Sequence, residues 1–151
     1  MFGDCTAGED NKVKRLSTRL KDKEERIQQI IAMLTEESAK GKLIVVEGKK
    51  DEIALQELGV SGKVLTVKTG GKSFLQATEE IEKLGESGVI LLLDFDRRGK
   101  EGTLRLKNSL ERAKVKANTK FWHDLQALVG KDISCVESLS SYLITLQEKV
   151  T

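Results

Sequence analysis

The alternation of short apolar runs with helical segments is the feature that most constrains the fold of this chain. From Gly41 onward, glycines separate these segments, and the chain contains no proline. Continuous apolar runs such as Leu43–Val46 and Val89–Leu93 are typical of strands that are buried in a parallel sheet. Strands are predicted at 43–46, 63–67, 89–93 and 115–118, and helices at 50–58, 73–84 and 97–113. This alternation predicts an α/β fold with three layers, a mostly parallel four-stranded sheet and right-handed crossovers.

The first forty residues differ from the rest of the chain. Residues 1–10 are small and polar and are predicted to be a disordered start, whereas residues 11–40 are predicted to form one long amphipathic helix. Apolar residues recur along this helix at intervals of seven: Val13, Leu20, Ile27 and Leu34. Lys23 interrupts the seam between them. Three interpretations are open: the helix packs on its own domain, it forms a coiled-coil seam in a homodimer, or it is freely solvated. We therefore predict an N-terminal helical extension at 1–40 and a domain at 41–151, with covering helices at 121–129 and 134–148.

The composition argues against membrane, secreted and zinc-dependent proteins. The run Val89–Leu93 is far shorter than the roughly 18 apolar residues of a membrane helix. The first residues carry neither a basic start nor an apolar stretch, so we expect no secretory signal. Cys5 and Cys135 are expected to be reduced thiols of a cytoplasmic protein. Because His123 is the one histidine, a structural zinc site lacks ligands unless two chains share it.

Acidic residues directly follow two of the predicted strands. Glu47 comes after the first strand, and Asp94 and Asp96 come after the third. Parallel sheets bind ligands beyond the carboxyl ends of their strands, and carboxylates suit Mg²⁺, which prefers oxygen ligands. The alternative for either aspartate is the N-cap of the next helix, and for Glu47 it is a solvated turn. Because capping needs only one of the two aspartates, we predict that all three residues form a site for Mg²⁺, with Mn²⁺ as a substitute.

Two motifs around these carboxylates resemble the Toprim domain. The first motif is Val45-Val46-Glu47-Gly48-Lys49-Lys50-Asp51, and the second is Leu92-Leu93-Asp94-Phe95-Asp96-Arg97-Arg98-Gly99. The resemblance covers residues 42–120 and is closest to the small stand-alone Toprim proteins of archaea, and next to the ribosomal RNA maturases. It implies a three-layer, Rossmann-like Toprim fold and phosphoryl transfer on a nucleic-acid backbone. It also implies that Asp94 and Asp96 hold Mg²⁺, and that Glu47 acts as a general acid or base or binds the metal.

The sequence departs from the larger members of that family. Its one tyrosine, Tyr142, lies in an apolar helical pattern and is predicted to pack rather than to act as the nucleophile of a topoisomerase. Two cysteines cannot form the four-cysteine site of recombination mediators, and the zinc module of primases is missing. We therefore predict a nuclease-like, Mg²⁺-dependent enzyme that acts on RNA or DNA. The alternatives are a non-catalytic, Mg²⁺-assisted component of an RNA-processing or ribosome-associated complex, and a primase-like nucleotidyl transferase.

Basic residues are concentrated just after the second motif. Residues 97–120 contain nine basic and two acidic side chains, although the net charge of the whole chain is only +2. Such a segment beside a metal site predicts a track for a phosphate backbone, and the alternative is a solvated helix face. The predicted nucleic-acid contacts are Lys49, Lys50, Lys68, Lys72, Arg97, Arg98, Lys100 and Arg105. Arg98 and Arg105 are seven residues apart and share one helix face, whereas Leu104 is expected in the core.

Two further patterns have structural interpretations. Phe121 and Trp122 form the one aromatic cluster and are predicted to lie in the core, so we expect contacts to phosphate rather than base stacking. Ser134 and Glu137 form a Ser-x-x-Glu pattern before an apolar run, which is typical of a capping box. Some Toprim relatives have a late glutamate, so a functional role of Glu137 is the alternative.

Overall fold

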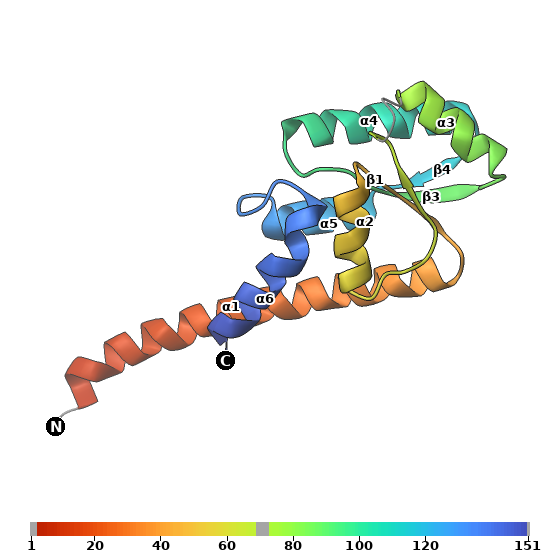
Figure 1. Cartoon of the computed structure of the whole chain (residues 1–151). Coiled ribbons are helices and arrows are strands. Elements are labelled where there is room, and N and C mark those ends of the chain that lie inside the picture. Colours follow the sequence, from red (N-terminus) through yellow and green to blue (C-terminus); the bar gives the residue numbers. More distant parts are fainter. Residues whose placement is uncertain (1–2, 69–72, 151) are drawn as a thin grey trace.

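The computed structural model describes residues 3–68 and 73–150, with side chains from residue 18 onward. Its helices and strands alternate as the sequence predicts (Figure 1). In chain order they are α1 (Gly3–Ala39), β1 (Leu43–Val46), α2 (Lys49–Glu57), β2 (Val64–Thr66), α3 (Phe74–Lys83), β3 (Gly88–Leu92), α4 (Arg97–Arg112), β4 (Lys116–Asn118), α5 (Lys120–Val129), the short 3-10 helix η2 (Val136–Ser138) and α6 (Leu139–Val150). None of the described helices is both long and apolar enough to cross a membrane.

The strands form one parallel sheet in the order β2-β1-β3-β4. In β1, Val46 pairs with Thr66 of β2 on one side and with Leu92 of β3 on the other. The chain therefore leaves β1 toward one edge of the sheet and continues from β3 toward the other edge. In open parallel sheets, such a reversal creates a crevice beyond the carboxyl ends of the strands, where ligands bind. The predicted four-stranded α/β fold is thus confirmed, and its ligand crevice lies between β1 and β3.

Helices cover both faces of the sheet and complete the three predicted layers (Figure 1). Along β1, Ile44 and Val46 point into a core that they share with α1, α2, α5 and α6. Leu43 and Val45 point into the other core, which they share with α3 and α4. Because side chains alternate along a strand and both faces are covered, all four residues of β1 are buried. This is why the strand needs a continuous apolar run.

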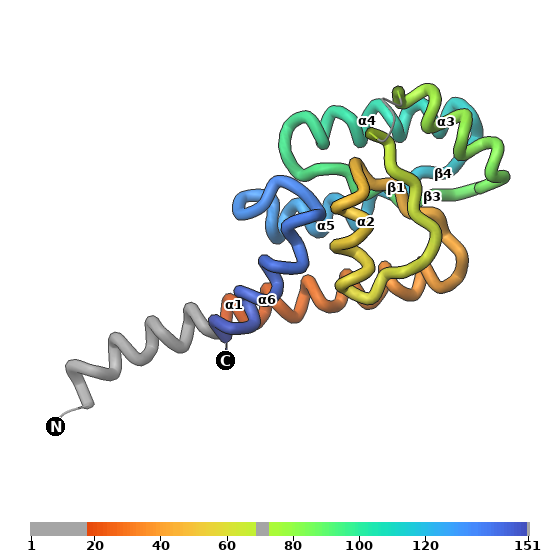
Figure 2. Tube along the Cα trace, in the orientation of Figure 1, coloured from red at the N-terminus to blue at the C-terminus, as the bar shows by residue number. Residues whose placement is uncertain are grey.

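The second half of α1 packs on the domain. Ile27, Ile31 and Leu34 are buried in the core that includes α5 and α6. For this half of α1 the first interpretation of the apolar stripe is confirmed, whereas Val13 lies before the residues whose side chains are described, and the homodimer and the domain boundary at residue 40 stay predictions. α1 begins at Gly3 and so includes most of the segment that is predicted to be disordered. Residues 1–2 lie outside the described part of the chain (Figure 1), and the tube in Figure 2 is coloured only from residue 18, where the description of side chains begins.

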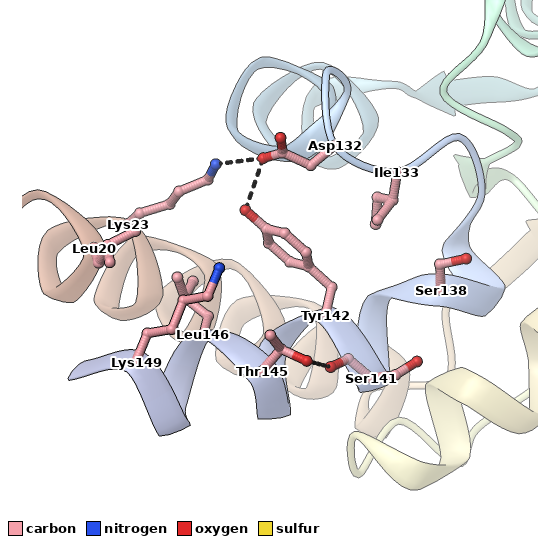
Figure 3. A pocket seen from close by; sticks show the side chains of 10 residues that line it. All are labelled: Leu20, Lys23, Asp132, Ile133, Ser138, Ser141, Tyr142, Thr145, Leu146 and Lys149. Carbon is pink, nitrogen blue, oxygen red and sulfur yellow. Dashed lines mark hydrogen bonds and ion pairs between the residues drawn. The ribbon is translucent and has the colours of Figure 1, made fainter. Parts of the chain in front are cut away.

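Lys23, which interrupts the apolar seam, points out of the core toward the loop after α5 (Figure 3). Its Nζ atom lies 2.8 Å from Asp132 Oδ2, and the hydroxyl of Tyr142 donates to the same oxygen over 2.8 Å. The ammonium of Lys23 holds the pKa of Asp132 below its usual range. These side chains line an open cavity of about 510 Å³ and fasten α1 to the C-terminal helices. Tyr142 therefore has a packing role, as predicted.

One prediction about α4 is wrong. Leu104 is 60% exposed rather than buried. The buried residues of α4 are Gly99, Gly102, Thr103, Leu106 and Leu110. Leu104 lies about 200° from Leu106 around the helix, because each residue turns the helix by about 100°. The glycines, and not the apolar residues alone, therefore define the face of α4 that meets the sheet. Phe121 and Trp122, by contrast, are buried as predicted.

Candidate functional site

The acidic residues after β1 and β3 meet at the carboxyl edge of the sheet, where the strand order reverses. Val46 and Leu92 are register partners, so Glu47 and Asp94 follow neighbouring strands at nearly the same level. They line a cavity of about 240 Å³. Its described lining residues are Glu47, Lys68, Phe74, Asp94, Asp96, Arg98, Glu101, Gly102 and Arg105. Six of the predicted site residues, all three carboxylates and three of the cations, thus surround one cavity.

Four of the remaining predicted cations are not among the described residues that line this cavity. Lys49 and Lys50 belong to α2, and Arg97 and Lys100 to α4. Lys49 forms an ion pair with a glutamate of α2 at 3.5 Å, and Arg97 forms an ion pair with a glutamate of α4 at 3.4 Å. Lys72 lies outside the described residues. The structure therefore separates an inner set of cations in the cavity from an outer, exposed set on the two helices.

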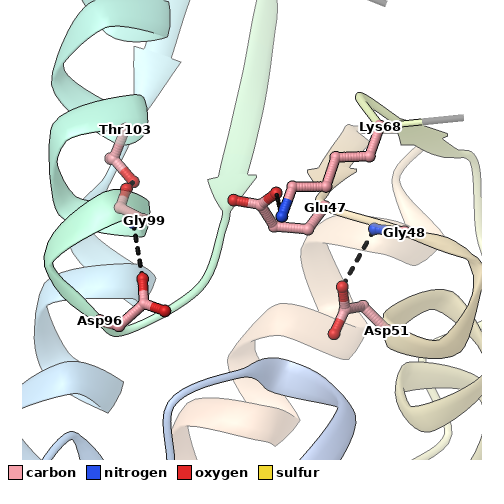
Figure 4. A network of polar contacts seen from close by, with 7 residues as sticks. All are labelled: Glu47, Gly48, Asp51, Lys68, Asp96, Gly99 and Thr103. Atoms are coloured by element: carbon pink, nitrogen blue, oxygen red, sulfur yellow. Dashed lines mark hydrogen bonds and ion pairs between the residues drawn. The ribbon is translucent and has the colours of Figure 1, made fainter. Parts of the chain in front are cut away.

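Glu47 is bound by Lys68, which follows β2. Lys68 Nζ lies 3.0 Å from Glu47 Oε2, and the backbone N–H of Lys68 donates to the carbonyl of Glu47 over 2.9 Å (Figure 4). The side chain of Glu47 is only 12% exposed, against 63% for Lys68. The hydrogen bond from Lys68 to Glu47 raises the pKa of Lys68, so the lysine stays charged and neutralises the glutamate.

Asp94 is the carboxylate whose protonation the fold changes most. Burial, followed by the negative charges of Glu47 and Asp51, raises the pKa of Asp94 to about 7. Its backbone is held from α5, because Trp122 Nε1–H is shared between the carbonyls of Leu93 at 3.0 Å and Asp94 at 3.1 Å. The crowded carboxylates are costly to ionise together, and a divalent cation among them would relieve that cost. The oxygen ligands and their mutual repulsion therefore fit Mg²⁺.

The second aspartate of the motif caps α4. Asp96 Oδ1 accepts from the Gly99 N–H over 2.8 Å, which confirms the capping interpretation for this residue (Figure 4). A Cβ atom on Gly99 would lie 1.9 Å from the carbonyl oxygen of Asp94, so only glycine allows α4 to approach the end of β3 so closely. No described group binds Asp96 Oδ2. One oxygen of Asp96 thus caps the helix and the other can bind a cation.

Asp51, the last residue of the first motif, has a role that the sequence analysis did not assign. The residue is 5% exposed, and its carboxylate accepts from the Gly48 N–H over 3.0 Å and from the Glu137 N–H over 2.7 Å. It therefore closes the turn behind Glu47 and ties that turn to a loop 86 residues later. The signal in the sequence was an acidic residue in the first turn of a helix, where it can accept from a free N–H group.

The capping box predicted at Ser134 and Glu137 is not formed. The residue before η2 is Cys135, which makes no side-chain cap hydrogen bond, and α6 begins only after η2. Asp51 accepts from the N–H of Glu137, the group that the serine would have bound. The carbonyl of Ser134 accepts from the Phe95 N–H over 2.7 Å. This loop therefore supports both acidic motifs instead of capping its own helix.

A second cluster of metal-binding residue types lies beside the first motif. Asp51, Cys135 and Glu137 each place one potential ligand atom within 4.8 Å of the others, and within the described ranges they are the one trio that does so. Both oxygens of Asp51 already accept backbone N–H groups, and a thiol suits softer metals than Mg²⁺. The carboxylates of the cavity are farther apart but offer only oxygen ligands, so they match Mg²⁺ better.

Comparisons with known proteins agree with the family resemblance and with the fold. The family model of the Toprim domain matches residues 41–119. A UPF0292 protein of Methanosarcina barkeri is 33% identical over 125 residues, which cover 83% of this chain and 85% of that protein. A UPF0292 protein of Methanocaldococcus jannaschii is 37% identical over 120 residues, which cover 79% of this chain and 91% of that protein. A solved structure of an Aquifex aeolicus protein is 25% identical with a TM-score of 0.59, and the match covers 73% of this chain and 94% of that one.

Proposed function

Because the chain belongs to the Toprim domain family, we propose that it is a Mg²⁺-dependent enzyme that acts on RNA or DNA by nuclease-like phosphoryl transfer. The observation that carries this proposal is the composition of the cavity between β1 and β3. It is lined by the carboxylates Glu47, Asp94 and Asp96 and by the cations Lys68, Arg98 and Arg105. Carboxylates that bind Mg²⁺ beside cations that bind phosphate are the groups that phosphoryl transfer requires.

The three carboxylates have different roles in this proposal. Asp94 and Asp96 hold the metal, and the fold fixes them with the Trp122 hydrogen bonds and the close approach of Gly99. The chemistry that Mg²⁺ would supply there is stabilisation of charge on the transferring phosphoryl group and orientation of the attacking water. Glu47 faces the same cavity and transfers a proton to or from the reacting oxygen as a general acid or base.

Arg98 and Arg105 are the inner phosphate contacts in this proposal. They lie seven residues apart on α4, and both line the cavity. The outer cations extend the track on both sides of the cavity: Lys49, Lys50, Arg97 and Lys100. Because Phe121 and Trp122 are buried, we expect phosphate contacts to dominate and sequence readout to be weak.

Assays with structured RNA, single-stranded DNA and duplex DNA, each with and without Mg²⁺, test this function. We expect Mg²⁺-dependent cleavage of at least one substrate and its loss when Asp94→Asn and Asp96→Asn are combined. Glu47→Gln should keep metal and substrate binding and lower turnover by about 10²–10⁴-fold. Mg²⁺-dependent binding without cleavage would instead identify a non-catalytic component, and nucleotide incorporation a primase-like transferase. A protein that neither binds nor cleaves nucleic acid in the presence of Mg²⁺ contradicts the proposal.

The phosphate contacts have their own test. Replacing Arg98 and Arg105 together with Gln should weaken binding to all sequences alike and reduce the salt slope of log K by about one to two. The control is the same double replacement of Arg19 and Arg26, which are exposed and also seven residues apart, on α1. If both double variants keep the wild-type salt dependence, the inner contacts are not phosphate contacts.

A further inference from the structure

We propose that Lys68 is an internal counter-ion that binds Glu47 in the metal-free protein and moves to a phosphate of the substrate when the metal site is filled. This inference rests on the proposed function, and it makes phosphate binding depend on the metal. Lys68 thereby couples metal binding by the carboxylates of the cavity to phosphate binding by its cations.

The backbone of Lys68 is fixed while its side chain is free to move. Its N–H donates to the carbonyl of Glu47 over 2.9 Å, and the preceding residue, Val67, donates to Val46 over 3.0 Å. The ammonium lies at the end of a flexible stem whose side chain is 63% exposed. Lys68 can therefore leave Glu47 by rotating its side chain, without any change in the β1–β2 ladder.

The charge of the cavity explains why the lysine is needed in the metal-free state. Among the described lining residues, four are acidic and three are basic, so this described lining carries a formal charge of −1. The glutamate that Lys68 binds is 12% exposed, and an unpaired carboxylate at that depth is costly. Lys68 lies in the field of Glu47 and of Asp94, and both carboxylates favour its charged form.

Metal binding reverses these conditions. A divalent cation changes the formal charge of the described lining from −1 to +1, so the cavity attracts phosphate instead of repelling it. It also neutralises the carboxylates, so Lys68 loses the field that held it at Glu47. A phosphate bound beside Arg98 and Arg105, which line the same cavity, would then offer the released ammonium a new partner.

Titration with Mn²⁺, followed by calorimetry, tests whether Lys68 competes with the metal. Lys68→Met should bind Mn²⁺ about two- to fivefold more tightly, since a surface ion pair contributes up to about 1 kcal/mol. Lys63→Met is the matched control, because Lys63 also forms an exposed ion pair with a glutamate, Glu86, but does not line the cavity. Arg98→Met controls for the electric field alone, because Arg98 lines the cavity but makes no described bond to Glu47. Weaker or unchanged binding in Lys68→Met, or an equal gain in Arg98→Met, overturns the proposal.

The salt dependence of nucleic-acid binding at saturating Mn²⁺ tests the second half of the proposal. Lys68→Met should lower the slope of log K by about one, the value for one lost phosphate contact, whereas Lys63→Met should leave it unchanged. An unchanged slope in Lys68→Met means that the lysine stays with Glu47 and overturns the proposal. If the wild-type protein itself does not bind Mn²⁺, or binds it equally well with Asp94→Asn and Asp96→Asn combined, the proposed function fails as well.

Discussion

Replacing Asp94 with Asn should stabilise the metal-free protein, and the gain should depend on pH. Burial and the charges of Glu47 and Asp51 raise the pKa of this carboxyl from 3.8 to about 7. Below about pH 4 the group is protonated in both the folded and the unfolded chain. As the pH rises toward 7, the Asp94 carboxyl ionises in the unfolded chain, which lowers the free energy of that state. In the folded chain the same carboxyl stays largely protonated over this range. The folded state therefore loses stability over this range, and Asn removes that loss.

The size of the effect follows from the pKa. A shift from 3.8 to about 7 corresponds to about 4 kcal/mol if the group is fully shielded, at 1.36 kcal/mol per pKa unit. Asp94 is only partly buried, and solvent screening reduces this value to about 1–2 kcal/mol. For a chain of this size, that free energy corresponds to a rise in Tm of about 2–8 °C.

Thermal unfolding in the presence of a chelator, measured between pH 4 and pH 8, checks this prediction. The stabilisation by Asp94→Asn should be small at pH 4, grow up to pH 7 and then level off. Asp132→Asn is a control of opposite sign, because Lys23 lowers the pKa of Asp132 and the lost ion pair should slightly destabilise the protein at neutral pH but not in acid. If Asp94→Asn lowers Tm at pH 8, or shifts it equally at all pH values, burial and the neighbouring carboxylates do not raise the pKa of Asp94.

Three other replacements test how the fold holds the site. Gly99→Ala places a Cβ atom 1.9 Å from the Asp94 carbonyl oxygen and should lower the free energy of unfolding by about 3 kcal/mol in urea titrations; a neutral effect would mean that α4 approaches β3 less closely. Asp51→Asn turns one acceptor into a donor and should cost about 1–3 kcal/mol, with faster hydrogen exchange at the Glu137 amide; unchanged exchange would refute that contact. Trp122→Phe removes the N–H that two carbonyls share. This replacement should lower the free energy of unfolding by about 1–2 kcal/mol and weaken Mn²⁺ binding in calorimetry. Wild-type Mn²⁺ affinity would show that Trp122 does not position Asp94.

The fold was predictable from the sequence because its signals are local. Strands buried on both faces need continuous apolar runs, and Leu43–Val46 and Val89–Leu93 are such runs. The carboxylates were predictable for a related reason, since residues that follow neighbouring parallel strands must meet at one edge of the sheet. The periodicity of α1 likewise predicted the buried positions Ile27 and Leu34.

Contacts between distant segments were not predictable in the same way. The pattern at Ser134 and Glu137 satisfied a local rule for helix capping. The backbone N–H of Glu137 instead donates to Asp51, which lies 86 residues away in the sequence. Leu104 was misplaced because the sequence does not show that α4 meets the sheet through its glycines, with Gly99 against the Asp94 carbonyl. In both cases a tertiary contact determined the outcome, and a local pattern cannot reveal it.

The position of a bound metal ion is the most direct test of the account. Crystals soaked in Mn²⁺ and measured near the manganese absorption edge locate the ion by its anomalous scattering. We expect a peak in the cavity at the ends of β1 and β3, bound by oxygens of Asp94 and Asp96. A peak at Asp51, Cys135 and Glu137 instead, or no peak at a concentration that saturates binding in solution, would contradict the assignment of this cavity as the metal site.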